Sequence, residues 1–279
     1  MVRAGTLTLL VGWLLALPAL AQNPQPVPVK FRWQPGQVLH YRVEQTTSET
    51  EVVGGVKVES TMKLSNVKRW QVLAVDAAGV ATMQQSLAAL RIERTTPTGA
   101  AALYDSADHD KSDPEMVKQL SKYVGTPLAV LRIDSLGKVV EVKDSKHAPA
   151  SRYEHELPFT VLLPTDGVWA SRYWDRQYQL TLEPPFGTGE KYPAAQRYAV
   201  KELTANHLTL TLATAIKAPP EDQAAVIQFQ PEGEIVFDVQ QGRLHRVRTT
   251  INKELKNHQG EESSYRFQGS YVEEFVAAP

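Results

Sequence analysis

Apolar residues recur at every second position over several long stretches of this chain, which is the pattern of a strand with one buried face. In Gln37–Thr47 the alternating residues are Leu39, Tyr41 and Val43, and the period resumes in Val56–Leu64. Further stretches of this kind are Trp70–Val75, Val80–Arg94, Trp169–Leu182, Lys191–Leu203, His207–Lys217 and Ser263–Val276. Short turn sequences, not helical crossovers, join the stretches from Gln37 to Arg94, so we expect a mostly β protein with long antiparallel strands.

Two stretches share one turn pattern. In Leu128–Val142, Asp134 is followed three residues later by Gly137, and in Pro231–Leu255, Asp238 is followed four residues later by Gly242. An Asp carboxylate can accept hydrogen bonds from the backbone of a turn, and Gly supplies a positive φ. The repetition predicts two related β halves, arranged as a curled sheet, a sandwich or a partial barrel.

One helix is expected, inserted in the first half near residues 113–124. Ser112-Asp113-Pro114-Glu115 has the spacing of a capping box with proline in the first turn. One apolar stripe follows at helical spacing, and it consists of Met116, Val117, Leu120, Tyr123 and Val124. Gly125 and Pro127 then end the helix. The stripe predicts packing across a sheet face.

Residues 1–21 have the features of a signal peptide. Arg3 gives a positive start, Leu7–Leu17 is apolar, and Ala19-Leu20-Ala21 is a small-residue cleavage site. We therefore expect cleavage after Ala21 and a periplasmic or secreted protein with no transmembrane segment in the mature chain. No cysteine follows the cleavage point, so a lipid anchor is not expected.

The mature chain divides into segments by composition. Residues 22–30 form a proline-rich tether, 31–143 the first β half, 144–168 a linker and 169–279 the second β half. Within the linker, the apolar run Leu157–Leu163 fits a strand or a short helix equally well.

The composition excludes cysteine chemistry and argues against one class of partner. The 279 residues include no cysteine, which excludes disulfides and thiolate nucleophiles. Lys and Arg number 30 against 31 Asp and Glu, a net charge of −1. This balance gives no electrostatic attraction to nucleic acid, which we do not expect as a partner.

Several short motifs are spread along the mature chain. The first is Trp33-Gln-Pro-Gly-Gln-Val-Leu-His-Tyr41, at the start of the first strand. The others are Leu103-Tyr104-Asp105-Ser106, Gly125 followed by Val130–Val142, and Leu163-Pro164 ahead of Trp174. With these motifs the chain resembles a family of exported bacterial β-rich proteins that has no established activity, and the resemblance covers most of the mature chain. It implies the β fold and export, and it assigns no catalytic residue.

The polar clusters match no known metal, phosphate or nucleophile motif. Asp105–Asp113 gathers four aspartates and His109 but lacks the glycine and alternating ligands of a calcium loop. His147, Glu154, His155 and Glu156 do not have the spacing of a zinc site. The glycines of Pro185–Lys191 do not have the spacing of a phosphate loop, and no Gly-x-Ser-x-Gly is present. We therefore expect no metal and no cofactor.

Two sets of residues remain as candidate binding sites. Arg243, Arg246 and Arg248 could contact an anion, although basic residues also protect an edge strand from aggregation. A second set of apolar and aromatic residues could line an apolar cavity under a curled sheet, or could simply fill the core: Leu120, Tyr123, Trp174, Tyr178, Tyr265, Phe267 and Tyr271. We favour a non-catalytic binding or envelope-associated module, with a small apolar, lipid-like ligand or an envelope protein as partner. The alternative is a hydrolase or metal-dependent enzyme acting on envelope material.

Overall fold

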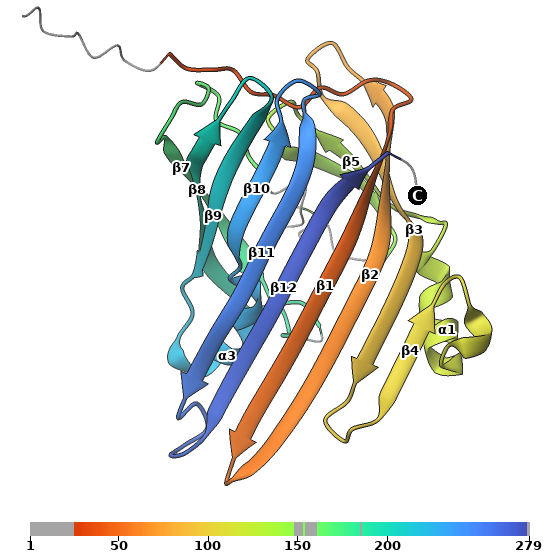
Figure 1. Ribbon diagram of the computed structural model, residues 1–279, viewed down its shortest axis with the longest axis vertical. Coiled ribbons are helices and arrows are strands. Elements are labelled where there is room, and N and C mark those ends of the chain that lie inside the picture. Colours follow the sequence, from red (N-terminus) through yellow and green to blue (C-terminus); the bar gives the residue numbers. More distant parts are fainter. Residues whose placement is uncertain (1–24, 148–152, 154–160, 185, 278–279) are drawn as a thin grey trace, which may run out of the picture.

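The computed structural model describes residues 25–147, 153, 161–184 and 186–277. They form one antiparallel sheet of 12 strands that curves without closing, with two short helices on its flanks (Figure 1). The strand order is β6-β5-β3-β2-β1-β12-β11-β10-β9-β8-β7, and β4 pairs with β3 beside β5. The predicted mostly β, antiparallel fold is confirmed.

The first half of the chain supplies β1 (Val38–Val53), β2 (Val56–Val75), β3 (Ala81–Thr95), β4 (Ala101–Asp105), β5 (Pro127–Ile133) and β6 (Val139–Ser145). The second half supplies β7 (Tyr173–Thr181), β8 (Lys191–Leu203), β9 (His207–Ile216), β10 (Glu232–Asp238), β11 (Arg243–Lys256) and β12 (Ser264–Val276). The helices are α1 (Pro114–Leu120) and α3 (Gln223–Val226), with 3₁₀ turns η1 (His109–Lys111), η2 (Ser121–Tyr123), η3 (Pro220–Asp222) and η4 (Ile227–Phe229).

The two halves meet where β1 pairs with β12, so they share a single sheet. β1 lies in the middle of the sheet between β2 and β12, and β6 and β7 form the two outer edges. The two Asp–Gly turns occupy different places in this order, since β5–β6 lies at an edge and β10–β11 lies inside the sheet.

One strand is longer than its sequence pattern indicates. Val56–Leu64 and Trp70–Val75 belong to the single strand β2, which pairs with β1 from Val56 to Gln71 without interruption. The polar residues between the two apolar stretches do not end the strand, because the backbone continues to pair with β1 and β3 on both sides.

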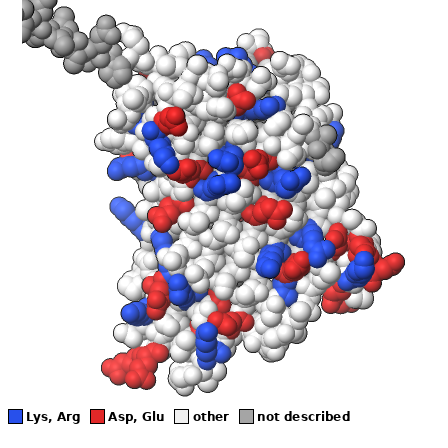
Figure 2. Space-filling model, in the orientation of Figure 1, with Lys and Arg blue, Asp and Glu red and all other residues white. Residues whose placement is uncertain are grey.

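The sheet has a concave inner face and a charged outer face. Along β1, Leu39, Tyr41 and Val43 are buried, whereas Arg42 and Glu44, at alternate positions, are exposed. Figure 2 shows the outer face, on which acidic and basic side chains alternate in rows across the strands. The alternation read from the sequence therefore separates the protein interior from solvent.

One end of the inner face is packed with apolar side chains; we call it the closed end. The N-terminal segment crosses it, and Phe31 N donates to Ser135 O (2.8 Å) while Arg32 N donates to Gly242 O (2.8 Å). Val29 and Phe31 are buried there. Phe31 and Arg32 thus connect the β5–β6 turn of the first half to the β10–β11 turn of the second.

Both segments that were predicted to lie outside the β halves contribute to this core. Val29 comes from residues 22–30, and Val161, Leu163 and Val168 come from residues 144–168; all are buried. Val27 pairs with Val168 through two backbone hydrogen bonds of 2.8 and 2.9 Å. Val161 and Leu163 belong to neither a helix nor a strand, and the preceding part of the Leu157–Leu163 run lies outside the described residues.

The inserted helix begins and ends as its sequence predicts. The Asp113 carboxylate accepts from Glu115 N (2.9 Å) and Met116 N (3.1 Å), with Pro114 in the first turn. α1 continues through η2 to Tyr123, and Gly125 follows with a φ of 73°. The helix prediction near 113–124 is confirmed, with its last turn tightened to 3₁₀ geometry.

The Asp–Gly turns also have the predicted conformation. Gly137 and Gly242 have φ values of 88° and 63°. The Asp134 carboxylate accepts from Leu136 N and Lys138 N, both at 2.9 Å, and the Asp238 carboxylate accepts from Gln241 N at 2.8 Å. The predicted signal peptide lies outside the described residues. In the described ranges, no helix is long and apolar enough to cross a membrane.

Candidate functional site

Two apolar clusters cover the flanks of the inner face beyond the core. On one flank α1 packs against β3 and β4, where Leu90, Tyr104 and Met116 are buried. On the other flank α3 packs against β7, β8 and β9, where Leu180, Tyr192 and Val226 are buried. In Figure 1 the two helices lie on opposite sides of the central strands, toward the end of the sheet that carries the β1–β2 turn. We call this the open end.

A groove of about 610 Å³ lies between the flanks at the open end of the inner face. Its floor is formed by the central strands β1, β2, β11 and β12. Arg94 of β3 and the following turn form one wall, and Phe186 and Phe229 form the other. The apolar and aromatic lining residues are Met62, Pro97, Phe186, Phe229, Ile251, Phe267 and Tyr271. The groove is therefore largely apolar along its length.

Strand register arranges the floor in rows. The row nearest the core pairs Tyr271 with Gln45, the next pairs Gly269 with Thr47, and the third pairs Phe267 with Glu49. A Cβ atom at Gly269 would lie 3.1 Å from Phe267 Cε1, so the phenyl ring of Phe267 leans over this glycine. The absence of a side chain at Gly269 therefore leaves room for the Phe267 ring.

A buried polar cluster separates the groove from the core. Tyr271 donates through its hydroxyl to Glu273 Oε2, while Lys68 Nζ lies 3.2 Å from the Tyr271 hydroxyl and 3.3 Å from Glu273 Oε2. The Glu273 side chain is 0% exposed and that of Lys68 is 7% exposed. Burial, and then the Glu273 charge, raise the pKa of Tyr271 well above its usual value. Tyr271 is therefore a neutral hydroxyl at the inner end of the groove.

The open end of the floor is acidic. Partial burial, and then the neighbouring Glu51 carboxylate, raise the pKa of Glu49. Tyr265 lies beside both acids, and burial together with the charges of Glu49 and Glu51 raises its pKa to about 12. Both raised pKa values indicate that a further negative charge is unfavourable in this part of the inner face.

The structure brings two of the candidate cavity residues, Phe267 and Tyr271, to the groove. The other candidates lie elsewhere. Leu120 packs in the α1 cluster, and Tyr123 contacts His147 with ring centroids 4.7 Å apart. Trp174 stacks on Tyr198 in the core, with ring centroids 5.6 Å apart, and Tyr178 packs in the α3 cluster. Tyr265 lies next to His258, with ring centroids 6.0 Å apart.

Sequence reasoning missed most of the groove lining. Thr47, Glu49 and Met62 occupy inward positions in their strands, and the two-residue alternation that places them there is visible in the sequence. Phe186 and Phe229 lie in a loop and a 3₁₀ turn, and no periodic signal connects them to the sheet. Only the strand order shows that these residues share one surface.

The basic residues of β11 occupy an interior strand of the sheet, not an edge strand. Arg246 lies opposite Glu274 of β12, and Arg248 lies opposite Glu234 of β10. The Arg243 guanidinium lies 3.6 Å from the centroid of the Phe275 ring. Arg246 and Arg248 therefore have acidic cross-strand neighbours that would compete with an anion.

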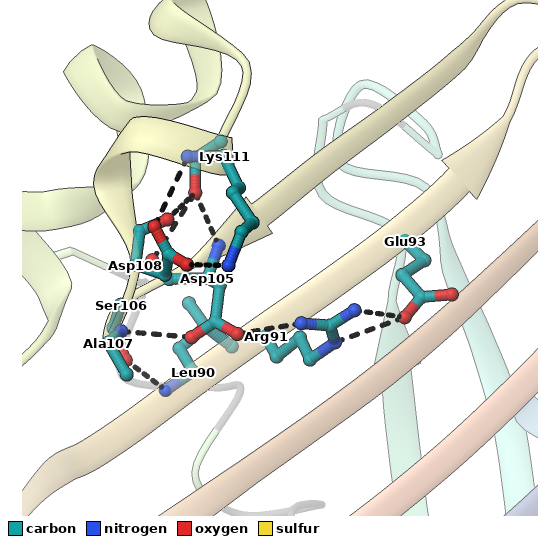
Figure 3. A network of polar contacts seen from close by, with 9 residues as sticks. Leu90, Arg91, Glu93, Asp105, Ser106, Ala107, Asp108 and Lys111 are labelled. Carbon is teal, nitrogen blue, oxygen red and sulfur yellow. Dashed lines mark hydrogen bonds and ion pairs between the residues drawn. The ribbon is translucent and has the colours of Figure 1, made fainter.

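The acidic segment Asp105–Asp113 is used to build the turn before α1 (Figure 3). Asp105 accepts from Arg91 Nη1 at 2.7 Å, and Arg91 also contacts Glu93 at 2.7 Å. Asp108 pairs with Lys111 at 2.7 Å and caps η1. In the ranges that the structure describes, no three His, Cys, Asp or Glu side chains are placed to hold a metal ion. Glu154, His155 and Glu156 lie outside those ranges.

No protein-family model matches this sequence, and neither does any curated protein sequence. Three solved structures show a distant likeness. A lipovitellin structure, titled for its lipid–protein interactions, has 12% identity and a TM-score of 0.41; the likeness covers 88% of the present chain and 26% of the lipovitellin chain. The present chain therefore spans about a quarter of lipovitellin's length.

The other two structures are covered over most of their length. DynF of the dynemicin biosynthesis pathway from Micromonospora chersina has 8% identity and a TM-score of 0.26, covering 95% of both chains. A domain named for outer membrane lipoprotein sorting, from Vibrio parahaemolyticus, has 12% identity and a TM-score of 0.17, covering 86% of both chains. These scores are too low to indicate a shared fold, so the site must be interpreted from its own residues.

Proposed function

We propose that this protein binds the apolar part of a lipid-like ligand in the groove on its inner face, and that it acts as a non-catalytic binding module. The observation that supports this function is the groove itself. About 610 Å³ lies open between two apolar clusters that are closely packed. Ligand sites are concave and mostly apolar, with volumes of roughly 300–1,000 Å³ and a few polar groups that fix orientation.

The polar groups in the groove are suited to orienting a ligand. Gln45 and Tyr271 lie together in the row nearest the core, and Thr47 lies in the next row. Met62, Ile251 and Phe267 supply flexible and aromatic apolar surface around them. Of the residues proposed from the sequence, Phe267 and Tyr271 are the ones we assign to the ligand site.

Filling the groove tests this function. Thr47 faces the groove, and Ser48 is the next residue of the same strand and faces the opposite side of the sheet. Thr47→Trp should weaken binding of a fluorescent acyl probe such as a dansylated fatty acid, whereas Ser48→Trp should leave it unchanged. Equal binding by both variants and the unmodified protein would place the probe outside the groove.

Native mass spectrometry of the protein purified without detergent provides an independent test. A copurified lipid-like mass in the unmodified protein, reduced in Thr47→Trp, is the expected result. A protein that carries no such ligand and binds no acyl probe would rule out the proposed function.

We also propose that the chain is exported and cleaved after Ala21, so that the mature protein begins at Gln22. This rests on Arg3, the apolar run Leu7–Leu17 and the small residues before the cleavage point. N-terminal sequencing of the protein from the extracytoplasmic fraction should give Gln-Asn-Pro-Gln. An intact Met1 on cytoplasmic protein would exclude this localisation.

A further inference from the structure

Two charged side chains line the groove among the described residues, and they have opposite sign. Glu49 of β1 lies in the floor, and Arg94 of β3 lies in one wall. Neither side chain forms a hydrogen bond or an ion pair with another residue in the described part of the chain. Charges without partners inside a binding groove are available to a ligand.

Charged residues close to Glu49 and Arg94 on the same strands already have partners. Arg91 lies 2.7 Å from both Glu93 and Asp105 (Figure 3). Because side chains alternate along β3, Arg91 and Glu93 point to the opposite face of the sheet from Arg94. Glu51 accepts from Gln259 Nε2 at 3.0 Å and lies 3.1 Å from His258 Nε2. The protein thus satisfies adjacent charges and leaves Glu49 and Arg94 unmatched.

The register fixes the separation of the two side chains. Glu49 lies opposite Ser60 of β2, and Arg94 lies opposite Met62 of the same strand. One strand and two residues therefore separate them, which corresponds to roughly 12 Å between their Cα atoms. Both point to the inner face, so a polar headgroup lying across β2 can contact both.

The surroundings of each charge differ in a way that favours particular ligand groups. Phe267 lies beside Glu49 on the neighbouring strand, and an aromatic face attracts an alkylated ammonium group. The hydroxyl residues Thr95 and Thr96, which directly follow Arg94 in the chain, line the groove on its side. Guanidinium and hydroxyl donors together suit a phosphate.

We propose that the ligand is a zwitterionic single-chain amphiphile, with its phosphate at Arg94, its ammonium group at Glu49 and its alkyl chain along the apolar lining. This inference rests on the proposed function and specifies its ligand class. A purely anionic ligand leaves Glu49 unmatched, and a purely cationic ligand leaves Arg94 unmatched. A cation beside Glu49 favours the ionised carboxylate and so offsets the effect of partial burial, which raises the pKa of Glu49.

Competition with a bound fluorescent acyl probe tests the headgroup. The four competitors are lysophosphatidylcholine, oleate, hexadecyltrimethylammonium and monoolein, all used below their critical micelle concentrations. Lysophosphatidylcholine should displace the probe at a concentration roughly three- to tenfold lower than the others, the difference expected from two charge-assisted contacts at a partly exposed site.

Two single substitutions separate the contacts. Arg94→Gln should weaken the binding of lysophosphatidylcholine and of oleate, and should leave the binding of hexadecyltrimethylammonium unchanged or make it tighter. Glu49→Gln should weaken the binding of lysophosphatidylcholine and of hexadecyltrimethylammonium, and should tighten the binding of oleate. Arg266→Gln on the outer face and Glu261→Gln in the β11–β12 turn are the controls, since each removes a charge of the same sign away from the groove. Neither should change the binding of any of the four competitors.

The outcomes distinguish this inference from the function on which it rests. If the probe binds in the groove but all four competitors act equally, the zwitterion assignment is wrong and lipid binding stands. The assignment is also wrong if the control substitutions alter selectivity as much as Arg94→Gln and Glu49→Gln do. If no probe binds to the folded protein, both proposals are wrong.

Discussion

Arg32 packs against Gly242 so closely that a Cβ atom at position 242 would lie 2.4 Å from Arg32 Cγ and 2.8 Å from Arg32 N. Gly242 also has a φ of 63°, and its carbonyl accepts from Arg32 N. The closed end therefore depends on a missing side chain in the β10–β11 turn. Gly137 shows the same relationship in the β5–β6 turn, with Val161 O at 2.4 Å.

The first prediction follows from this contact. Gly242→Ala should lower the free energy of unfolding by about 3 kcal/mol, because it combines an unfavourable φ with a clash against backbone. Gly79→Ala is the matched control, since Gly79 has a φ of 80° and nothing within 4 Å of its Cβ position. It should cost about 1 kcal/mol. Urea denaturation measures both, and equal costs would show that the Arg32 contact is unimportant.

Strand periodicity and turn chemistry predict most of this architecture. The alternation around Tyr41 gives the buried face of β1, and Asp238 with Gly242 gives the turn before β11. Both signals are local, because they depend on residues a few positions apart. The helix is equally local, since Asp113 caps α1 through its own neighbours.

The groove and the closed end could not be predicted in this way, because they depend on strand order. Phe31 bonds to Ser135, while Glu49 and Phe267 become neighbours through the β1–β12 pair. These partners are far apart in the sequence, and many strand orders satisfy the same periodicity. Aromatic residues such as Trp174 and Phe267 look alike in the sequence, yet one fills the core and the other lines the groove.

The second prediction concerns the buried cluster between core and groove. Lys68→Met should destabilise the protein by roughly 3–5 kcal/mol, because it removes the ammonium group that lies 3.3 Å from the fully buried Glu273 carboxylate. The double variant Lys68→Met/Glu273→Gln should recover part of this loss, since no uncompensated charge remains. Thermal unfolding of both proteins checks the effect. A single variant as stable as the unmodified protein would show that Glu273 is not charged in the folded state.

The third prediction separates α1 from the ligand site. Leu120 and Met116 pack in the α1 cluster and do not line the groove. Leu120→Ala should cost about 2 kcal/mol, and Met116→Ala, at a more deeply buried position, somewhat more. Lys118→Ala on the exposed face should change stability by less than about 0.5 kcal/mol.

Acyl-probe binding by the Leu120→Ala protein should match that of the unmodified protein, because the helix forms a packed flank. Near-native stability combined with altered probe binding would instead identify α1 as a lid over the ligand.

The last prediction uses the raised pKa of Glu49, which partial burial and the charge of Glu51 produce. Because the folded state holds this proton more tightly than the unfolded state, both states are protonated at low pH and Glu49 contributes no pH dependence there. As pH rises from the normal glutamate range through the raised pKa, ionisation favours the unfolded chain and stability falls.

Glu49→Gln, which mimics the protonated acid, should therefore stabilise the ligand-free protein near pH 7. The melting temperature of Glu49→Gln relative to the unmodified protein should increase from pH 4 to pH 7. Glu261→Gln, at an exposed turn position, controls for the loss of one acidic charge. The same pH trend in both variants would mean that net charge, and not the environment of Glu49, causes the effect.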